Sequence, residues 1–222
     1  MYVVVGNNVQ ETAIAVLLHF YELFPSRILS VKYHLRPSSP LQTANLRGIS
    51  QWFKSCECSV DKFTIDISKE SKVEDFICVV RRVHSNVTVS STPSATFKAN
   101  VRFDCSSLYS FESSWLTMDT LFTAKCPSIT LFNTKLVNSD INKYIKTWMN
   151  GKTSSSQETL KMKLAENVMA YEMIRGIPAS KVDYVEYGGM NVIDIERDDG
   201  HVLKAKWTED DPKHIEIKIK KN

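Results

Sequence analysis

Short β-branched runs alternate with longer amphipathic stretches at the start of the chain. Val3 to Val5 predicts a buried strand, Glu11 to Phe24 predicts a helix that ends at Pro25, and Arg27 to Tyr33 predicts a second strand. A strand, a crossover helix and a second strand of this length form a βαβ unit, whose two strands are parallel. The first segment of the chain therefore predicts a parallel sheet.

The same alternation continues through the N-terminal half. Residues 43–54 and 71–84 keep the helical period, and residues 62–67 and 86–90 are short enough, and rich enough in β-branched residues, to be strands. Helices that alternate with parallel strands are typical of a Rossmann-like layered sheet. We therefore expect an α/β, Rossmann-like domain over residues 1–138.

An amphipathic helix separates this part from the rest of the chain. Ser139 and Asp140 can cap its start, and Asn150-Gly151 can end it. Its apolar stripe consists of Ile141, Tyr144, Ile145 and Trp148. The serine-rich residues 152–157 follow as a linker. Residues 139–157 are therefore interpreted as a helix and a linker between two domains.

The C-terminal part predicts a smaller α+β domain over residues 158–222. Glu158 to Arg175 has helical spacing, and Glu166 falls among the methionines of one stripe. Strands are predicted over 182–187, 191–196 and 201–207, and the turn Asp198-Asp199-Gly200 joins the last two into a hairpin.

Composition places the chain among folded globular proteins. Hydrophobic residues make up 43% and charged residues 24% of its 222 residues, which excludes wholesale disorder. The net charge of +3 comes from 28 basic and 25 acidic residues, a balance too even to indicate nucleic-acid binding by itself. Any basic surface must be local.

Targeting signals and cysteine usage favour a cytoplasmic protein. The chain has no stretch of eighteen or more apolar residues, and its first residues lack the basic region of a secretory signal, so we expect no membrane association. Five cysteines are an odd number, and we expect them to be reduced and mostly buried. They are Cys56, Cys58, Cys78, Cys105 and Cys126.

Two loops are candidates for binding an anionic nucleotide. Gly6-Asn7-Asn8 follows the first predicted strand, and Ser91-Thr92-Pro93-Ser94 follows the strand at 86–90. In Rossmann-like sheets, ligands lie at the carboxyl ends of the strands, against helix N-termini that attract anions. The alternative is that these residues are ordinary turn and cap residues. The sequence has neither a Gly-x-Gly-x-x-Gly nor a Walker motif, so a conventional dinucleotide or ATP site is not expected.

Charged residues on the predicted hairpin suggest metal chemistry. Asp194 and Glu196 share one face of their strand, and Lys204 and Lys206 share a face of the partner strand. Together with Glu166 on the predicted helix, this order resembles the PD-(D/E)xK nuclease family, which has a restriction-endonuclease-like fold. Alternatively, the hairpin is simply an exposed, charged one. Another acid-x-Lys pair, Glu216-Ile217-Lys218, is more simply explained as the solvated side of an alternating strand.

The nuclease resemblance implies roles for individual residues. Glu166 and Asp194 would hold Mg²⁺ or Mn²⁺, and Lys206 would assist the attacking water. The family's remaining acidic position is occupied by Lys204, so activity would require Glu196 to supply the missing ligand.

The layout as a whole resembles the CRISPR-associated Rossmann-fold (CARF) effectors of antiviral defence. This resemblance implies a homodimer that binds a cyclic oligonucleotide at Gly6, Asn7, Asn8, Ser91, Thr92 and Ser94, and thereby regulates a metal-dependent nuclease acting on nucleic acid. The alternative is a catalytically inactive module that binds nucleic acid or a protein partner.

Overall fold

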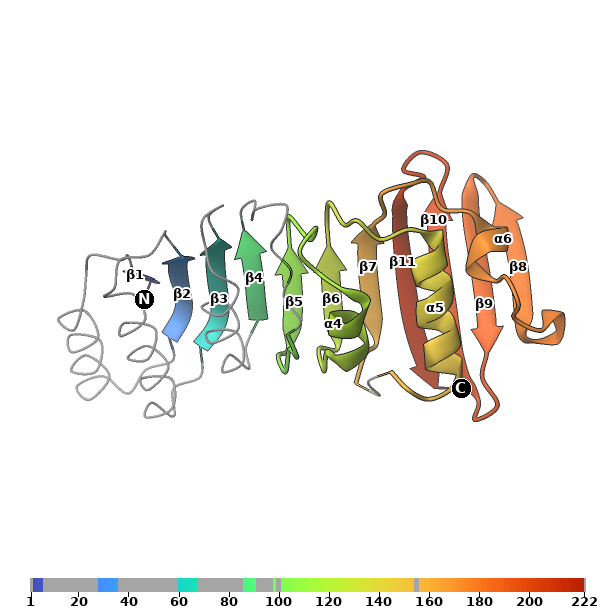
Figure 1. Ribbon diagram of the computed structural model, residues 1–222, viewed down its shortest axis with the longest axis horizontal. Coiled ribbons are helices and arrows are strands. Elements are labelled where there is room, and N and C mark those ends of the chain that lie inside the picture. Colours follow the sequence, from blue (N-terminus) through green and yellow to red (C-terminus); the bar gives the residue numbers. More distant parts are fainter. Residues whose placement is uncertain are drawn as a thin grey trace.

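Eleven strands form one continuous sheet in a computed structural model of the chain, which describes residues 2–5, 28–35, 60–67, 86–90, 98, 101–153 and 156–221 (Figure 1). The strands are β1 (Tyr2–Val5), β2 (Ile28–Leu35), β3 (Val60–Ile67), β4 (Asn86–Ser90), β5 (Ser107–Ser110), β6 (Ser128–Leu131), β7 (Thr159–Lys163), β8 (Val182–Tyr187), β9 (Met190–Glu196), β10 (His201–Thr208) and β11 (His214–Lys221). The helices among the described residues are α4 (Met118–Thr123), α5 (Asn138–Met149), α6 (Ala170–Met173) and a 3₁₀ turn (Ala179–Lys181).

The sheet has a parallel half and an antiparallel half. Strands β1 to β7 lie in chain order, each parallel to the one before it. Asn86, Ser107 and Ser128 lie side by side on β4, β5 and β6 at intervals of 21 residues. This sequential order and regular spacing are typical of solenoid proteins, in which each repeat contacts only its neighbours. Beyond β7 the sheet continues as β11, β10, β9 and β8, all antiparallel.

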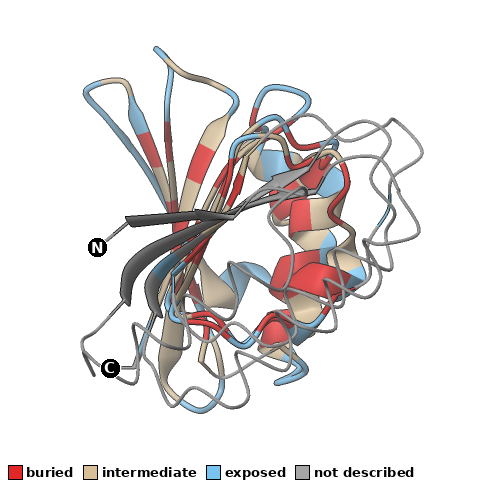
Figure 2. Ribbon diagram, turned by 90° about the vertical axis from the view of Figure 1, so that its left-hand side faces the viewer, coloured by how far each residue is buried: buried red, intermediate tan, exposed pale blue. Residues whose placement is uncertain are grey.

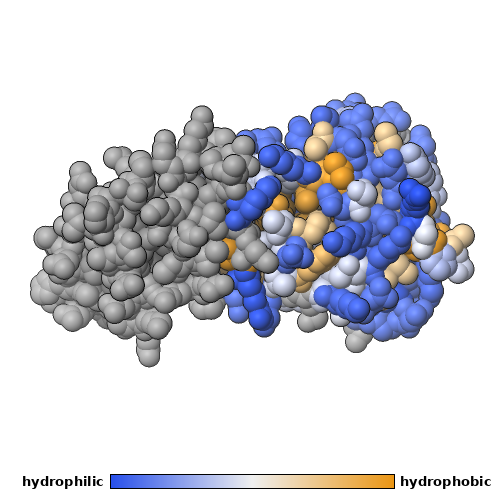
Figure 3. Space-filling view, in the orientation of Figure 1, coloured by the Kyte–Doolittle hydropathy of each residue, from blue (hydrophilic) through white to orange (hydrophobic). Residues whose placement is uncertain are grey.

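Only one face of the sheet carries the described helices. Successive residues of a strand point to opposite faces, and the inward positions Val87, Leu108, Ile129 and Leu160 are buried in one row across β4 to β7. Helices α4, α5 and α6 lie over this face (Figures 1 and 2), where hydrophilic side chains cover most of the described surface (Figure 3). The outward positions of β4 to β11 remain partly exposed, and we call this side the open face.

A buried polar network fixes the helix layer to the sheet. The Tyr144 hydroxyl on α5 donates a 2.8 Å hydrogen bond to Gln157 Oε1. The amide nitrogen of Gln157 donates to the carbonyls of Leu121 and Ala124 at 2.7 and 3.1 Å. Because burial disfavours the charged phenolate, it raises the pKa of Tyr144. Each buried polar group in this network has a partner, so its desolvation is compensated.

The predicted fold class, a Rossmann-like sheet joined to a separate α+β domain, is wrong. One sheet passes from β6 through β7 into β11. The order of β1 to β7 never reverses, so this part of the sheet lacks the switch point at which doubly wound folds bind ligands. Doubly wound sheets are also covered on both faces, whereas β4 to β7 alternate buried and partly exposed positions.

Local predictions in the C-terminal half have mixed outcomes. The predicted helix over Glu158 to Arg175 is wrong, because this segment contains strand β7, a loop and the short helix α6. The helix that contains Tyr144 is confirmed, and so is the hairpin of β9 and β10. The β8–β9 turn needs Gly188 and Gly189, whose φ angles of 57° and 74° suit a tight hairpin turn.

The cysteine prediction is confirmed where the structure describes it. Cys105 and Cys126 are buried free thiols, while Cys56, Cys58 and Cys78 lie outside the described residues.

Replacing Leu160 by alanine is expected to destabilise the fold by about 2–5 kcal/mol, because it leaves a cavity in the buried row. The adjacent outward residue offers a matched control, since Thr159→Ala should change the free energy of unfolding by no more than about 0.5 kcal/mol. Urea unfolding of both variants measures the difference. Equal effects at the two positions would contradict the assignment of inward and outward faces.

Candidate functional site

Glu166 anchors the start of helix α5. Its carboxylate accepts hydrogen bonds from the backbone N–H and from the side-chain amide of Asn138, both at 2.8 Å. The side-chain nitrogen of Asn138 also donates to the Asn167 carbonyl. The side-chain oxygen of Asn138 accepts a hydrogen bond from the Met169 N–H at 2.9 Å. A carboxylate at a helix N-terminus satisfies free N–H groups and complements the helix dipole. The contacts of Glu166 are therefore those of a capping residue.

The hairpin residues lie together on the open face. Lys204 on β10 faces Asp194 on β9 across the hairpin, with 2.8 Å between Nζ and Oδ2. The other carboxylate oxygen of Asp194 is buried without a hydrogen-bond partner among the described residues. Lys206 faces Val192, and Glu196 faces Val202. Asp194 thus has one satisfied and one unsatisfied oxygen.

The metal and nucleotide roles remain predictions. In the described part of the chain, no three acidic, histidine or cysteine side chains gather in a way that could hold a metal ion. Glu166 and Asp194 are therefore not brought together as a ligand set there. The predicted nucleotide-binding residues Gly6, Asn7, Asn8, Ser91, Thr92 and Ser94 lie outside the described residues.

An aromatic strip, formed by Tyr109, Phe111, Phe132 and His214, crosses the open face. The Tyr109 and Phe111 rings meet edge to face with centroids 4.8 Å apart, and Phe132 lies 5.6 Å from Tyr109 and 6.4 Å from Phe111. The rings of Phe132 and of His214 on β11 are steeply inclined to each other, at 72°, with their centroids 6.2 Å apart. Phe111 remains 50% exposed. The strip presents aromatic rings to solvent across the junction between the two halves of the sheet.

A pocket of about 460 Å³ continues the strip on the same side. His214 belongs to both, because it contacts Phe132 and also lines the pocket. The other residues that line the pocket are Lys161, Met190, Lys206, Trp207, Thr208, Asp211 and Glu216. A concave site with an apolar wall and a few charged groups is suited to binding a side chain of a partner.

Two lysines and two carboxylates line this pocket, and Lys163 and Lys218 pair with the carboxylates from outside the lining. Glu216 Oε1 is shared by Lys161 at 3.1 Å and Lys218 at 3.3 Å. Burial by itself raises the pKa of the Glu216 carboxyl, but hydrogen bonds from these two lysines outweigh it and hold that pKa below its ordinary value. Lys206 forms no ion pair with any described residue. Its ammonium group is therefore available to an acidic partner.

Sequence reasoning did not identify the aromatic strip. The available signal was alternation: Tyr109 and Phe111 are outward positions at and just after β5, and Phe132 directly follows β6. Two-residue periodicity predicts strands with one solvated face. Only the strand register shows that the rings from separate segments become neighbours.

Residues 95–162 match the model of a protein family described as F-box associated. The matched segment contains β5, α4, β6, α5 and most of β7. No curated protein and no solved structure matches the chain. The predicted kinship with CARF effectors and PD-(D/E)xK nucleases, together with the antiviral role that it implied, is therefore wrong.

No helix among the described residues is long and apolar enough to cross a membrane.

The capping role of Glu166 predicts that Glu166→Ala lowers the free energy of unfolding by about 1 kcal/mol, as the loss of a helix cap does. Glu158→Ala, at an exposed carboxylate without an ion pair in the described part, is the control. Thermal unfolding with and without Mg²⁺ or Mn²⁺ also tests the metal prediction. A metal held by Glu166 would stabilise the wild type and not the variant. Unchanged stability of Glu166→Ala without metal would contradict the cap.

The lowered pKa of Glu216 predicts a loss of stability in acid. A carboxyl whose folded pKa lies below its unfolded value of about 4.3 contributes stability above that pH, and the contribution is lost as pH falls. The free energy of unfolding of wild type should therefore exceed that of Glu216→Gln at pH 7, and this difference should shrink below about pH 4. Urea unfolding across this range measures it, with Glu158→Gln as control. A difference that does not vary with pH would contradict the ionic contribution.

Proposed function

We propose that this chain is a protein-recognition module that binds another protein through the open face of its sheet. The observation that carries the proposal is the continuity of the aromatic strip, through His214, with a pocket that contains Lys206, which is unpaired among the described residues. Aromatic residues are enriched at the centres of protein interfaces, where they bury large areas at low entropic cost. An exposed patch of this kind on a folded domain marks an interaction site.

The chemistry of the surface specifies the partner segment. The rings of Phe111 and Phe132 would pack against apolar side chains, and the pocket beside them would accept an acidic side chain that pairs with Lys206. An acidic residue close to apolar ones is therefore the recognised pattern. The charge would speed association and fix the register, while the aromatic contacts would supply most of the affinity.

Two further observations support a binding role. The matched family is described as F-box associated, which links domains of this kind to F-box proteins and their interactions. Solenoid proteins, whose sequential strand order this sheet shares, use extended surfaces of this kind for binding. A cytoplasmic location is part of the proposal, because the free buried thiols Cys105 and Cys126 fit a reducing compartment.

Selection from a displayed peptide library tests the proposal. Peptides that bind the whole chain should combine acidic and apolar residues, and their affinity should fall by roughly tenfold or more for Phe111→Ala or Lys206→Glu, as expected for central interface residues. The control is Tyr171→Ala, because Tyr171 is 67% exposed but lies on α6, over the other face. Selected peptides that lose affinity equally for all three variants, or for none, would contradict binding at the open face.

A further inference from the structure

Strand β8 forms one end of the sheet and carries an unpaired backbone edge. It pairs only with β9 among the described strands. In an antiparallel pair, half of the N–H and C=O groups of the outer strand point away from the partner, and they can accept a further strand. The six residues of β8, Val-Asp-Tyr-Val-Glu-Tyr, therefore present an open hydrogen-bonding edge.

The side chains of β8 are exposed on both faces of the sheet. Tyr187 is 84%, Val185 50% and Tyr184 45% exposed. Proteins usually protect such edges with lysine, proline, a bulge or a covering segment. None of the six β8 residues is lysine or proline, and its register with β9 runs without a bulge from Val182 to Tyr187. An exposed edge that lacks lysine, proline and a bulge has the geometry of a strand-addition site.

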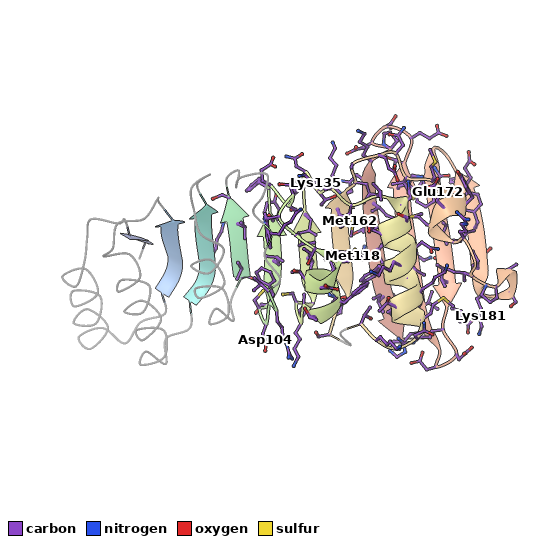
Figure 4. All side chains as sticks on the ribbon, in the orientation of Figure 1. Asp104, Met118, Lys135, Met162, Glu172 and Lys181 are labelled. Carbon is purple, nitrogen blue, oxygen red and sulfur yellow. The ribbon has the colours of Figure 1, made fainter. Side chains whose placement is uncertain are left out.

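The charge at this edge is strongly negative. Residues 182–200 contain six carboxylates and one arginine. Asp194, Asp198 and Asp199 are already paired with Lys204, Lys181 and Arg197. Lys181 lies beside the start of β8 at this end of the ribbon (Figure 4). Asp183 and Glu186 on β8 and Glu196 on β9 have no ion pair within the described ranges, so their charge is available to a partner.

The same charges disfavour a second copy of this chain as the partner. The antiparallel register that would pair all six β8 residues with a second β8 places Asp183 of each copy opposite Glu186 of the other. Directly opposed like charges destabilise a strand pair. A basic strand in the same place would instead put lysine or arginine opposite both carboxylates.

The geometry points to β8 as an edge that accepts an extended, basic segment of a partner protein by strand addition. The segment should carry apolar residues opposite Val182, Tyr184, Val185 and Tyr187 and basic residues opposite Asp183 and Glu186. Its pattern is apolar, basic, apolar, apolar, basic, apolar, which reads the same in both chain directions. This site is separate from the proposed open-face binding and requires the opposite charge in its partner.

The test uses the full chain and blocked fluorescent peptides. The peptide with the core VKVYKV should bind, and its acidic counterpart VEVYEV should not. Reversing the edge charge with Asp183→Lys and Glu186→Lys together should weaken VKVYKV binding by about tenfold and strengthen VEVYEV binding. The matched control reverses two exposed carboxylates elsewhere, Glu158→Lys and Asp210→Lys, and should leave VKVYKV affinity unchanged. Melting temperatures confirm that all variants are folded.

Backbone pairing is tested with two methylated forms of VKVYKV. Each form carries methyl groups on alternate backbone nitrogens, so that only one of them blocks the edge that faces β8. One form should lose binding and the other should retain it. Equal affinities of both forms, or no binding of VKVYKV to the wild type, would overturn the proposal. A wild-type dimer in sedimentation that the edge-charge reversal dissociates would also overturn it, since the occupant would then be a second copy.

Discussion

Strand β7 is the element on which both halves of the sheet depend. Leu160 lies beside Ile129 in the parallel ladder to β6 and beside Ile217 in the antiparallel ladder to β11, and all three are buried. The buried residue Gln157, just before β7, ties the same segment to α4 and α5. In the described part of the sheet, β7 is the strand that joins the sequential array to the antiparallel strands, and helix α5 spans the same junction by contacting both α4 and α6.

Burial on one side of the sheet makes its other side available for binding. The buried inward row supplies the hydrophobic stabilisation of the sheet. The outward positions therefore need not be apolar, and they carry threonine, lysine or aromatic residues. On β4, β5 and β6, Thr88, Tyr109 and Thr130 occupy one outward row, and Lys161 and Glu216 continue it onto β7 and β11. The change from small and aromatic to charged residues therefore coincides with the change from parallel to antiparallel pairing.

The sequence predicted local elements better than their assembly. Helix α5 and the β9–β10 hairpin have strong signals, namely an amphipathic stripe with caps and a turn between alternating strands. The pattern of residues 158–175 fits both a helix and a strand. Leu160, Leu164 and Val168 have helical spacing, whereas Leu160, Met162 and Leu164 alternate as in a strand. The segment 159–163 forms a strand because it pairs with β6 on one side and with β11 on the other. Strand order was not predictable, since similar crossover segments serve doubly wound and sequential sheets. The candidate site depends on that order, because Phe132 and His214 meet only across it.

The distribution of charge divides the described surface into two chemically different regions. At and around the pocket, Lys161 and Lys218 share Glu216, Lys163 pairs with Asp211, and Lys206 has no ion pair with a described residue, so four lysines face two carboxylates beside the aromatic strip. At the β8 end, Asp183 and Glu186 leave an excess of negative charge beside exposed apolar residues. Because specificity is a difference between affinities, a segment attracted to one region is repelled by the other. The two proposed sites would therefore select partner segments of opposite charge.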